Sequence, residues 1–339
     1  MRRRIGIAAL AAVVSTAATC GGPTRTPTTS DVASSWAGFA RMPGGEWRLT
    51  LESGNRMFDT WSWGPGRHSI RRETAGAGAA GEPWRALEVV HRRPGLDEFR
   101  LFGLSPFARG VTEGTTTFDG DVVDAVFELH QTGARRDMRR RWVFDGPDRY
   151  RATLSEATGA GDYVPLGEWE YVRSETLTPV EPRADDERPE RSAHLVPLDP
   201  FVGRTFAAEG VRDGADVLRV RSTVEWIPSA DYVRVRAVEE TGDGASIPLL
   251  DAYVYHHTGR DALRLLALSR EGGVYEGDVI ELEGGALRFD LRGHDGERVV
   301  EVEVRLDLEA DGSVRQRVWA LDGSERTPSL DVLHGRSGE

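Results

Sequence analysis

The chain contains no lysine: all 43 residues of the Lys and Arg class are arginines. Without an ε-amine, the sequence excludes a Schiff-base lysine, the lysine of a phosphate-binding P-loop and the active-site lysine of protein kinases. The 339 residues include 39 glycines and 17 prolines, and 39% of them are hydrophobic. This composition is typical of a folded chain rich in turns, and its length favours two domains.

Cysteine occurs once, at Cys20, so no intrachain disulfide can form and each core must be stable without one. Three arginines at positions 2–4 and an apolar run over 5–14 precede it, which is typical of an export signal. Residues 17–22 resemble a bacterial lipobox, in which the cysteine is acylated and becomes the first mature residue. We therefore expect a signal peptide over 1–19, lipidation at Cys20 and a flexible tether over 20–40. Ordinary signal cleavage beside a stray cysteine is the alternative.

Acidic residues outnumber basic ones by 55 to 43, for a net charge of −12, and most of the excess lies in the second half of the chain. A surface of this sign repels phosphate backbones, so we expect no nucleic-acid partner. The leader and the lipobox predict an exported protein in the periplasm or outer membrane, attached to the membrane through its N-terminal lipid.

Alternating apolar and polar residues predict β-strands along most of the chain. Val300, Val302 and Val304, for example, alternate with Glu301 and Glu303. Turn sequences separate such runs, and no long helical period lies between them. The pattern predicts an all-β protein of two tandem antiparallel up-and-down barrels, each of about eight to ten strands, because closure removes exposed sheet edges.

The same order of signals occurs twice. Residues 110–114 read GVTEG and residues 273–277 read GVYEG, while Trp63-Gly64-Pro65 parallels Trp226-Ile227-Pro228. A shared order of this length predicts a duplication. We place the first barrel domain at 41–173 and the second at 198–336. The segment 174–197 between them is rich in proline and charge and is interpreted as a linker.

Short motifs at the start and end of each unit resemble those of lipocalin-type (calycin-like) barrels. Gly45-Glu46-Trp47 matches the G-x-W motif of that family, and Arg173 matches its terminal arginine. The resemblance implies that Arg173 lies over Trp47 and closes the base of the barrel, and that Phe206 and Arg336 do the same in the second unit. Residues 198–204 also resemble the opening of bacterial lipocalin-like domains of unknown function. These motifs imply a fold more than an activity.

A literal G-x-G-x-x-G motif at 76–81 is interpreted as a hairpin loop, because Pro83 and a strand follow it where a dinucleotide site needs a helix. The sequence contains no nucleophile elbow, no HExxH motif and no carboxylate pair at a diagnostic spacing. These absences favour a protein that is not an enzyme, although an enzyme stays open as an alternative, and no cofactor is predicted.

The candidate ligand-binding residues are strand histidines and two arginines: His68, His91, His130, Arg139, Arg141, His256 and His257. Adjacent residues in a strand point to opposite faces, so only one of His256 and His257 can enter a barrel, and no metal site is predicted. Arg139 and Arg141 share one face of a basic stretch that could hold an anionic ligand, although a turn followed by a solvated strand explains it more simply.

Three functional interpretations stay open. The first is an envelope lipoprotein in which at least one barrel binds a small apolar or amphipathic ligand. The second is a structural or protein-interaction lipoprotein whose barrels are filled by their own aromatic side chains. The third is an enzyme that acts on a small molecule inside a barrel. The volume of each interior separates the first interpretation from the second, because ligand pockets require several hundred Å³.

Overall fold

The computed structural model describes most of the chain from residue 36 onward. The described residues are 36–50, 56–77, 83–94, 98–159, 161–174, 191–212, 216–227, 231–242, 244–295, 298–323 and 325–336. Cys20 and the expected signal peptide over 1–19 lie outside these ranges.

The first half of the chain forms a closed antiparallel barrel of ten strands in which every strand pairs with its neighbours along the chain. Its strands are β1 (Glu46–Thr50), β2 (Arg56–Trp63), β3 (Ser69–Ala77), β4 (Pro83–Arg93), β5 (Glu98–Ser105), β6 (Gly110–Asp119), β7 (Val122–Gln131), β8 (Ala134–Phe144), β9 (Arg149–Ala157) and β10 (Tyr163–Ser174). Pairing of β1 with β10 closes the barrel.

The second half repeats this architecture. Its strands are β11 (Arg204–Arg212), β12 (Asp216–Ile227), β13 (Tyr232–Glu240), β14 (Ser246–His257), β15 (Ala262–Ser269), β16 (Val274–Glu281), β17 (Leu287–Asp295), β18 (Arg298–Leu308), β19 (Val314–Asp322) and β20 (Glu325–Arg336). Pairing of β11 with β20 closes the second barrel. The prediction of two tandem antiparallel up-and-down barrels is thereby confirmed.

Four short 3-10 helices complete the described secondary structure: η1 (Pro65–Arg67), η2 (Phe107–Arg109), η4 (Ala193–Leu198) and η6 (Glu283–Gly285). Within the described residues, none of these helices has the length or apolar character needed to cross a membrane.

Apolar and polar side chains alternate along the strands, so that the apolar ones face the lumen and the polar ones face outward. In β18, Val302 and Val304 are buried in the core of the second barrel, whereas Glu301 and Glu303 face outward. Side chains of a β-strand point to alternate faces, so one apolar phase is enough to fill a barrel.

The repeated glycines Gly114 of β6 and Gly277 of β16 lie in equivalent places. Gly114 pairs with Leu101 and Phe127, and Gly277 pairs with Leu265 and Leu291. A Cβ atom at either glycine would overlap a carbonyl oxygen of the next strand, so the close approach of the two strands requires glycine. The short sequence repeat therefore marks the same packing constraint in both barrels.

A segment before the first strand enters each barrel. Trp36, Phe39 and Met42 belong to the core of the first barrel. Trp36 and Phe39 fall within the range expected to be a tether, and their burial shows that the packed segment extends at least to Trp36. In the same way Leu195 and Leu198 of η4, placed in and beside the expected linker, belong to the core of the second barrel. Residues 175–190 of that linker lie outside the described ranges.

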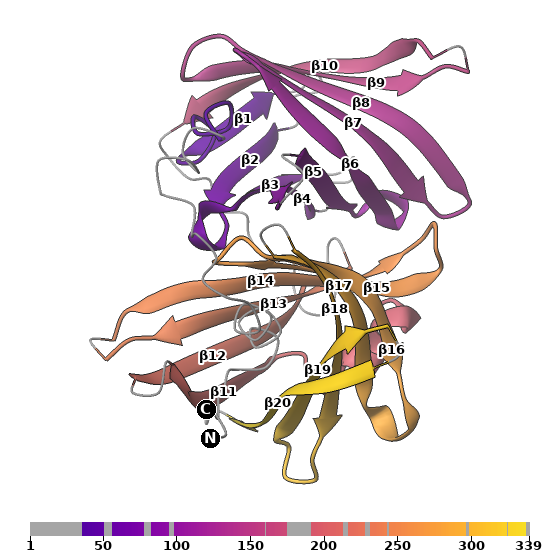
Figure 1. Cartoon of the computed structure of the whole chain (residues 1–339). Helices are drawn as coiled ribbons and strands as arrows, with labels where there is room; N and C mark the ends of the chain where they lie inside the picture. Colours follow the sequence, from indigo (N-terminus) through magenta and orange to yellow (C-terminus); the bar gives the residue numbers. More distant parts are fainter. Residues whose placement is uncertain are drawn as a thin grey trace.

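The two barrels contact each other through the outer faces of their middle strands (Figure 1). Strands β4, β5 and β6 of the first barrel supply apolar residues to this interface, and β13, β14, β15 and β16 of the second supply the others. The buried members are Leu87, Val89, Phe102, Leu104, Val111, Tyr232, Tyr253, Tyr255, Leu266, Leu268 and Val274. The interface strands are therefore buried on both faces, one facing the lumen of their own barrel and the other facing the neighbouring barrel.

Candidate functional site: two barrel interiors and the interface between them

The residues expected to close the barrels lie together in the first barrel. Trp47 of β1 pairs with Arg173 of β10, and the guanidinium carbon of Arg173 lies 4.5 Å from the centroid of the Trp47 ring. Arg173 also donates hydrogen bonds to the carbonyl oxygens of Gly44 (2.8 Å) and Arg41. Such a cation–π contact with two backbone hydrogen bonds ties the last strand to the segment before the first. In the second barrel, Phe206 of β11 pairs with Arg336 of β20.

Aromatic side chains fill the lumen of the first barrel. Its buried core includes Trp36, Phe39, Trp47, Trp61, Ile70, Phe127, Met138, Trp142, Phe144, Tyr150 and Tyr171. Other aromatic residues lie outside this core: Phe102 belongs to the interface between the barrels, Phe107 is 55% exposed, and Trp84 contacts Phe107. The first barrel is therefore filled by its own side chains.

A charged cluster lies among these aromatic residues. Asp59 of β2 is fully buried and accepts hydrogen bonds from Arg72 Nε (2.9 Å), Thr74 Oγ1 (2.8 Å) and the Tyr150 hydroxyl (2.8 Å). On β4, Glu88 accepts a hydrogen bond from Arg72 Nη1 at 2.5 Å and a second from Arg140 of β8. Two carboxylates and two guanidinium groups thus neutralise one another inside the barrel.

The pKa values of Glu88 and Tyr150 indicate that this charged cluster has a structural role. Burial raises the pKa of the Glu88 carboxyl, but Arg140 and Arg72 oppose this and lower it to about 2. Burial also raises the pKa of the Tyr150 hydroxyl well above its usual value. General bases work best with a pKa near the working pH, and a nucleophile needs an accessible deprotonated form. These groups have neither property, so the cluster orders the barrel and offers no acid–base chemistry at neutral pH.

The second barrel has an apolar cavity in its lumen. The cavity contains about 520 Å³ of space not filled by protein atoms, including the space that opens to solvent. Its walls are formed by Leu198, Phe201, Phe206, Ser222, Val224, Val233, Val235, Val254, Leu287, Phe289, Leu306 and Val314. Ser222 is the one polar residue of this lining. Its hydroxyl is buried and has no hydrogen-bond partner among the described residues.

Strand pairing relates the two interiors position by position. Trp47 pairs with Asp59, and Phe206 pairs with Ser222, so Asp59 and Ser222 are equivalent. The same pairing, followed from strand to strand around both barrels, gives an equivalent in the second barrel for each polar lumen residue of the first. The residues Asp59, Arg72, Glu88, Arg140, Tyr150 and Tyr171 correspond, in this order, to Ser222, Val235, Ala252, Val304, Val314 and His334. The second barrel lacks the whole charged cluster.

The same comparison explains the cavity. Trp61 is equivalent to Val224, and Trp142 is equivalent to Leu306. Both aliphatic residues line the cavity, as does Val314, which is equivalent to Tyr150. Smaller side chains at equivalent positions in barrels of equal strand number leave space that the aromatic rings fill in the first barrel.

One buried histidine lies on the inner face of the second barrel. His334 of β20 is fully buried and contacts Gln316 of β19, with 3.1 Å between His334 Nε2 and Gln316 Oε1. Burial lowers the pKa of His334 to about 4, so its imidazole is neutral at pH 7. The interior of the second barrel is therefore uncharged at this position.

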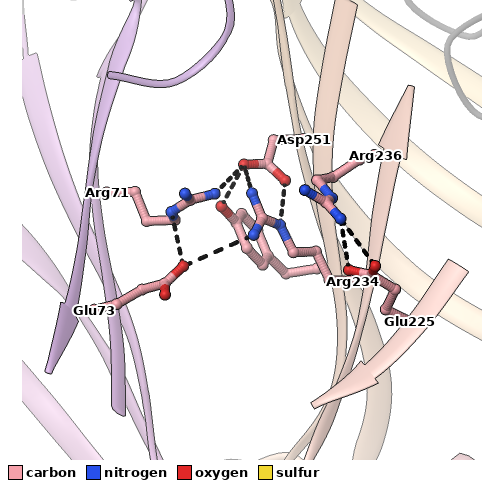
Figure 2. A network of polar contacts seen from close by, with 7 residues as sticks. Arg71, Glu73, Glu225, Arg234, Arg236 and Asp251 are labelled. Atoms are coloured by element: carbon pink, nitrogen blue, oxygen red, sulfur yellow. Dashed lines mark hydrogen bonds and ion pairs between the residues drawn. The ribbon is translucent and has the colours of Figure 1, made fainter. Parts of the chain in front are cut away.

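Charged residues also link the two barrels (Figure 2). Asp251 of β14 accepts from Arg71 of β3 (3.2 Å) and from Arg234 of β13 (2.8 Å), and the Tyr253 hydroxyl donates to it at 2.9 Å. Glu73 of β3 lies 3.0 Å from Arg71 and 3.7 Å from Arg234. Burial raises the pKa of Asp251 to about 6 against the opposing effect of Arg71, so this carboxylate is ionised at pH 7. The alternating charges fix the orientation of one barrel on the other.

The structure places His68, His91, His130 and His257 at or near this interface, whereas His256 is in phase with Val254 on the inner face of β14, at the end of the strand. His68 lies beside Gly272 of the second barrel, and His91 Nε2 lies 4.0 Å from Glu276 Oε1. The rings of His130 and His257 come from different barrels and have centroids 4.9 Å apart. His256 stacks on His194 of η4, with 3.6 Å between ring centroids.

The candidate arginines lie apart from these histidines, on the outer face of the first barrel. Arg139 of β8 donates to Asp124 of β7 at 2.8 Å, and Arg141 is exposed. Arg140 between them points into the lumen, where it contacts Glu88. Arg139 and Arg141 thus share a face, as the alternation predicts.

Glu113, His130 and His257 place three ligand-type atoms within 4.8 Å of one another. However, His257 Nδ1 accepts a hydrogen bond from the Gly259 N–H at 3.2 Å, which leaves the proton of the neutral ring on Nε2. Nε2 is the atom that faces Glu113, at 3.4 Å. Metal-binding histidines carry the proton on the nitrogen away from the metal, so this geometry describes a contact between the barrels.

A second group consists of His194, His256 and Asp261. The two imidazole planes are nearly parallel, at 5°, with 3.6 Å between their centroids. A metal ion lies in the plane of each imidazole that binds it, because the nitrogen lone pair lies in that plane. Two parallel planes have no point in common, so this stacked pair does not form a chelate.

The charged cluster and the polar difference between the two lumens were not predicted from the sequence. A signal was present, since Asp59 is in phase with Met57 and Trp61, and Arg72 is in phase with Ile70. A charged residue within an apolar phase indicates a buried ion pair. The partner of each such residue depends on the barrel register, which the sequence alone does not give.

Comparison with known proteins gives little further information. No protein-family model matches the chain, and no curated protein matches it. Among solved structures, the chain is similar to a protein of unknown function from the DUF3598 family of Nostoc punctiforme. The identity is 11%, the match covers 89% of this chain and 99% of that chain, and the TM-score is 0.22. A match at this TM-score does not indicate what the chain binds.

Proposed function

We propose that the protein is an exported lipoprotein whose second barrel binds a small apolar ligand, while its first barrel serves as a filled structural domain. The observation that carries this proposal is the apolar cavity of the second barrel, at positions where the first barrel has tryptophan and tyrosine. Ligand pockets are concave, mostly apolar and a few hundred Å³ in volume, with a small number of polar groups. The lining is apolar with Ser222 as its one polar residue, and the 520 Å³ includes space open to solvent, so it is an upper bound on the room for a ligand.

A fluorescence titration with the neutral apolar dye N-phenyl-1-naphthylamine tests the proposal. We expect saturable binding of one dye per chain, which an unlabelled alkyl ligand displaces. Two variants reproduce the first barrel in the second: Val224→Trp copies Trp61, and Leu306→Trp copies Trp142. Each places an indole in the cavity and is expected to abolish binding.

Val126→Trp is the matched control, because Val126 lies on the outer face of the first barrel and is 46% exposed. It adds the same side chain without entering a lumen and is expected to bind dye normally. Circular dichroism checks that each variant is folded. Equal dye binding by a folded Val224→Trp or Leu306→Trp variant would contradict the proposal, as would no binding by the unaltered chain.

The membrane anchor and the lipocalin-like relationship belong to the same proposal. The lipobox-like sequence around Cys20 supports the anchor, and the contact of Arg173 with Trp47 supports the relationship. We expect labelled palmitate to be incorporated into the chain in a bacterial host and not into Cys20→Ala. Labelling that persists in Cys20→Ala would exclude lipidation at this residue.

A further inference from the structure

Resting on the proposed function, we infer that the ligand of the second barrel is an uncharged, mostly hydrocarbon molecule with one oxygen-containing group that hydrogen-bonds to Ser222. A fatty alcohol or a neutral ester belongs to this class, and a fatty-acid anion or a phospholipid headgroup does not. Three features of the lumen support the inference.

The first feature is the unpartnered hydroxyl of Ser222. Ser222 is 1% exposed and lines the cavity, and its Oγ has no partner among the described residues. A buried hydroxyl without a hydrogen bond has lost its contacts with water and gained nothing in return, which is unfavourable. A ligand oxygen in the cavity would remove this cost, which gives the site a preference for one polar atom.

The second feature is the place of Ser222 in the barrel. In the first barrel the equivalent Asp59 accepts a hydrogen bond from the Tyr150 hydroxyl, which reaches it from β9 at 2.8 Å. In the second barrel both side chains are shorter, because Ser222 and Val314 occupy these positions, and both line the cavity. The space between them is where the first barrel forms a hydrogen bond, so a ligand group placed there can restore one.

The third feature is the lack of compensating charge. Every residue of the cavity lining other than Ser222 is leucine, phenylalanine or valine. The positions of Arg72 and Arg140 in the first barrel are occupied by Val235 and Val304 in the second. His334, on the same inner wall, is neutral at pH 7 because burial lowers its pKa to about 4. A carboxylate or phosphate in this lumen would be desolvated without a counter-charge, which is strongly unfavourable.

Competition between ligands of equal chain length tests the inference. Decan-1-ol, decanoate and decane are each titrated against N-phenyl-1-naphthylamine bound to the full chain at pH 7.4. We expect decan-1-ol to compete at a concentration at least about tenfold lower than decanoate, because the anion lacks a counter-charge. Decanoate should compete better as the pH is lowered toward the pKa of its own carboxyl group.

Variants at Ser222 separate the hydrogen bond from general apolar contact. Ser222→Ala removes the hydroxyl and should lower the affinity for decan-1-ol by about three- to tenfold, the usual range for one hydrogen bond. The affinity for decane should change little. Ser222→Thr keeps the hydroxyl and should retain the preference for decan-1-ol. Thermal unfolding confirms that each variant is folded.

The outcomes distinguish this inference from the proposed function. Dye binding with equal affinity for decan-1-ol and decanoate would overturn the inference and leave an apolar site. A preference for decan-1-ol that survives Ser222→Ala would exclude Ser222 as the hydrogen-bonding partner and would also overturn it. Failure of the unaltered chain to bind the dye or any decyl compound would overturn both.

Discussion

Asp59 and Ser222 occupy the same position in the two barrels, each paired with the aromatic residue of the first strand, Trp47 or Phe206. Asp59 is the centre of a buried hydrogen-bond network, and Ser222 has no partner among the described residues. One fold therefore carries two kinds of interior, a charged and filled one and an apolar and hollow one. The difference follows from side chains at equivalent positions, and the number of strands is the same.

Substitution of each residue by alanine should have very different effects on stability. Asp59→Ala removes the acceptor of Arg72, Thr74 and Tyr150 and leaves the Arg72 guanidinium buried with only Glu88 as its acidic partner. Breaking a buried pair in this way typically costs about 3–5 kcal/mol. Ser222→Ala removes a buried hydroxyl that has no partner among the described residues, so it should not lower stability.

Urea denaturation at pH 7, followed by circular dichroism, measures both free energies of unfolding. Because the two substitutions occupy equivalent positions, each serves as the control for the other. Similar losses from the two variants would show that Asp59 is not the centre of a stabilising network.

Glu88 should make the chain sensitive to acid. Arg140 and Arg72 overcome the effect of burial and hold the pKa of Glu88 at about 2 in the folded state, below the value of 4.5 for a free glutamate. The folded state thus binds this proton less readily than the unfolded state. Its contribution of about 3 kcal/mol is fully present above pH 4.5 and is lost as the pH falls toward 2.

Glu88→Gln removes this charge and should lower stability at pH 7 by about 3 kcal/mol, with a weaker pH dependence between 4.5 and 2. The control is Glu168→Gln, at a 56% exposed side chain that lies 3.5 Å from Arg151. Exposed pairs of this kind contribute less than about 1 kcal/mol. Denaturation midpoints measured across this pH range compare the two variants, and parallel profiles would contradict the role of Glu88.

Much of the fold could be predicted from alternation and turns, because each strand needs only one apolar phase to line a barrel. Trp47 and Arg173 were placed together through the resemblance of their motifs. The contact between the barrels was not predicted, although its strands carry a signal. Residues 249–255 of β14 are buried without interruption, and residues 265–269 of β15 are buried in the same way. A strand buried on both faces indicates a second packing surface, but which strands meet across that surface depends on three-dimensional placement.

The apolar interface should make the two barrels unfold together. Phe102 of β5 is buried there, and its ring centroid lies 4.8 Å from that of Tyr255. Phe102→Asp places a carboxylate in this contact without touching either lumen, so we expect the barrels to separate and unfold in two steps. Val126→Asp, on the exposed outer face of β7, should leave a single transition.

Two probes can follow this prediction. Tryptophan fluorescence reports mainly on the first barrel, because seven of the nine tryptophans precede residue 174, and circular dichroism reports on both barrels. The two curves should coincide for the unaltered chain and diverge for Phe102→Asp. Coincident curves for Phe102→Asp, or divergent curves for the unaltered chain, would show that the interface does not couple the barrels.

His91 should make the interface weaker in mild acid. Its side chain is buried between the barrels, and Nδ1 has no hydrogen-bond partner among the described residues. Burial lowers the pKa of His91 to about 4, with Glu276 opposing the shift and Arg100 and Arg93 adding to it. The unfolded histidine binds its proton near pH 6.5, so the unfolded state is favoured as the pH falls from 6.5 toward 4.

The loss of stability attributable to His91 should be about 2 kcal/mol between pH 7.5 and pH 5. Most of it should vanish in His91→Gln, which cannot be protonated. His194→Gln removes an exposed histidine and should leave the acid profile almost unchanged. Urea midpoints at half-unit pH steps provide the comparison. His334, whose pKa burial lowers to about 4, and Asp251, whose pKa burial raises to about 6, also affect stability in this window, so the difference between His91→Gln and the unaltered chain is what reports on His91. An unaltered slope in His91→Gln would assign the acid sensitivity to these other groups.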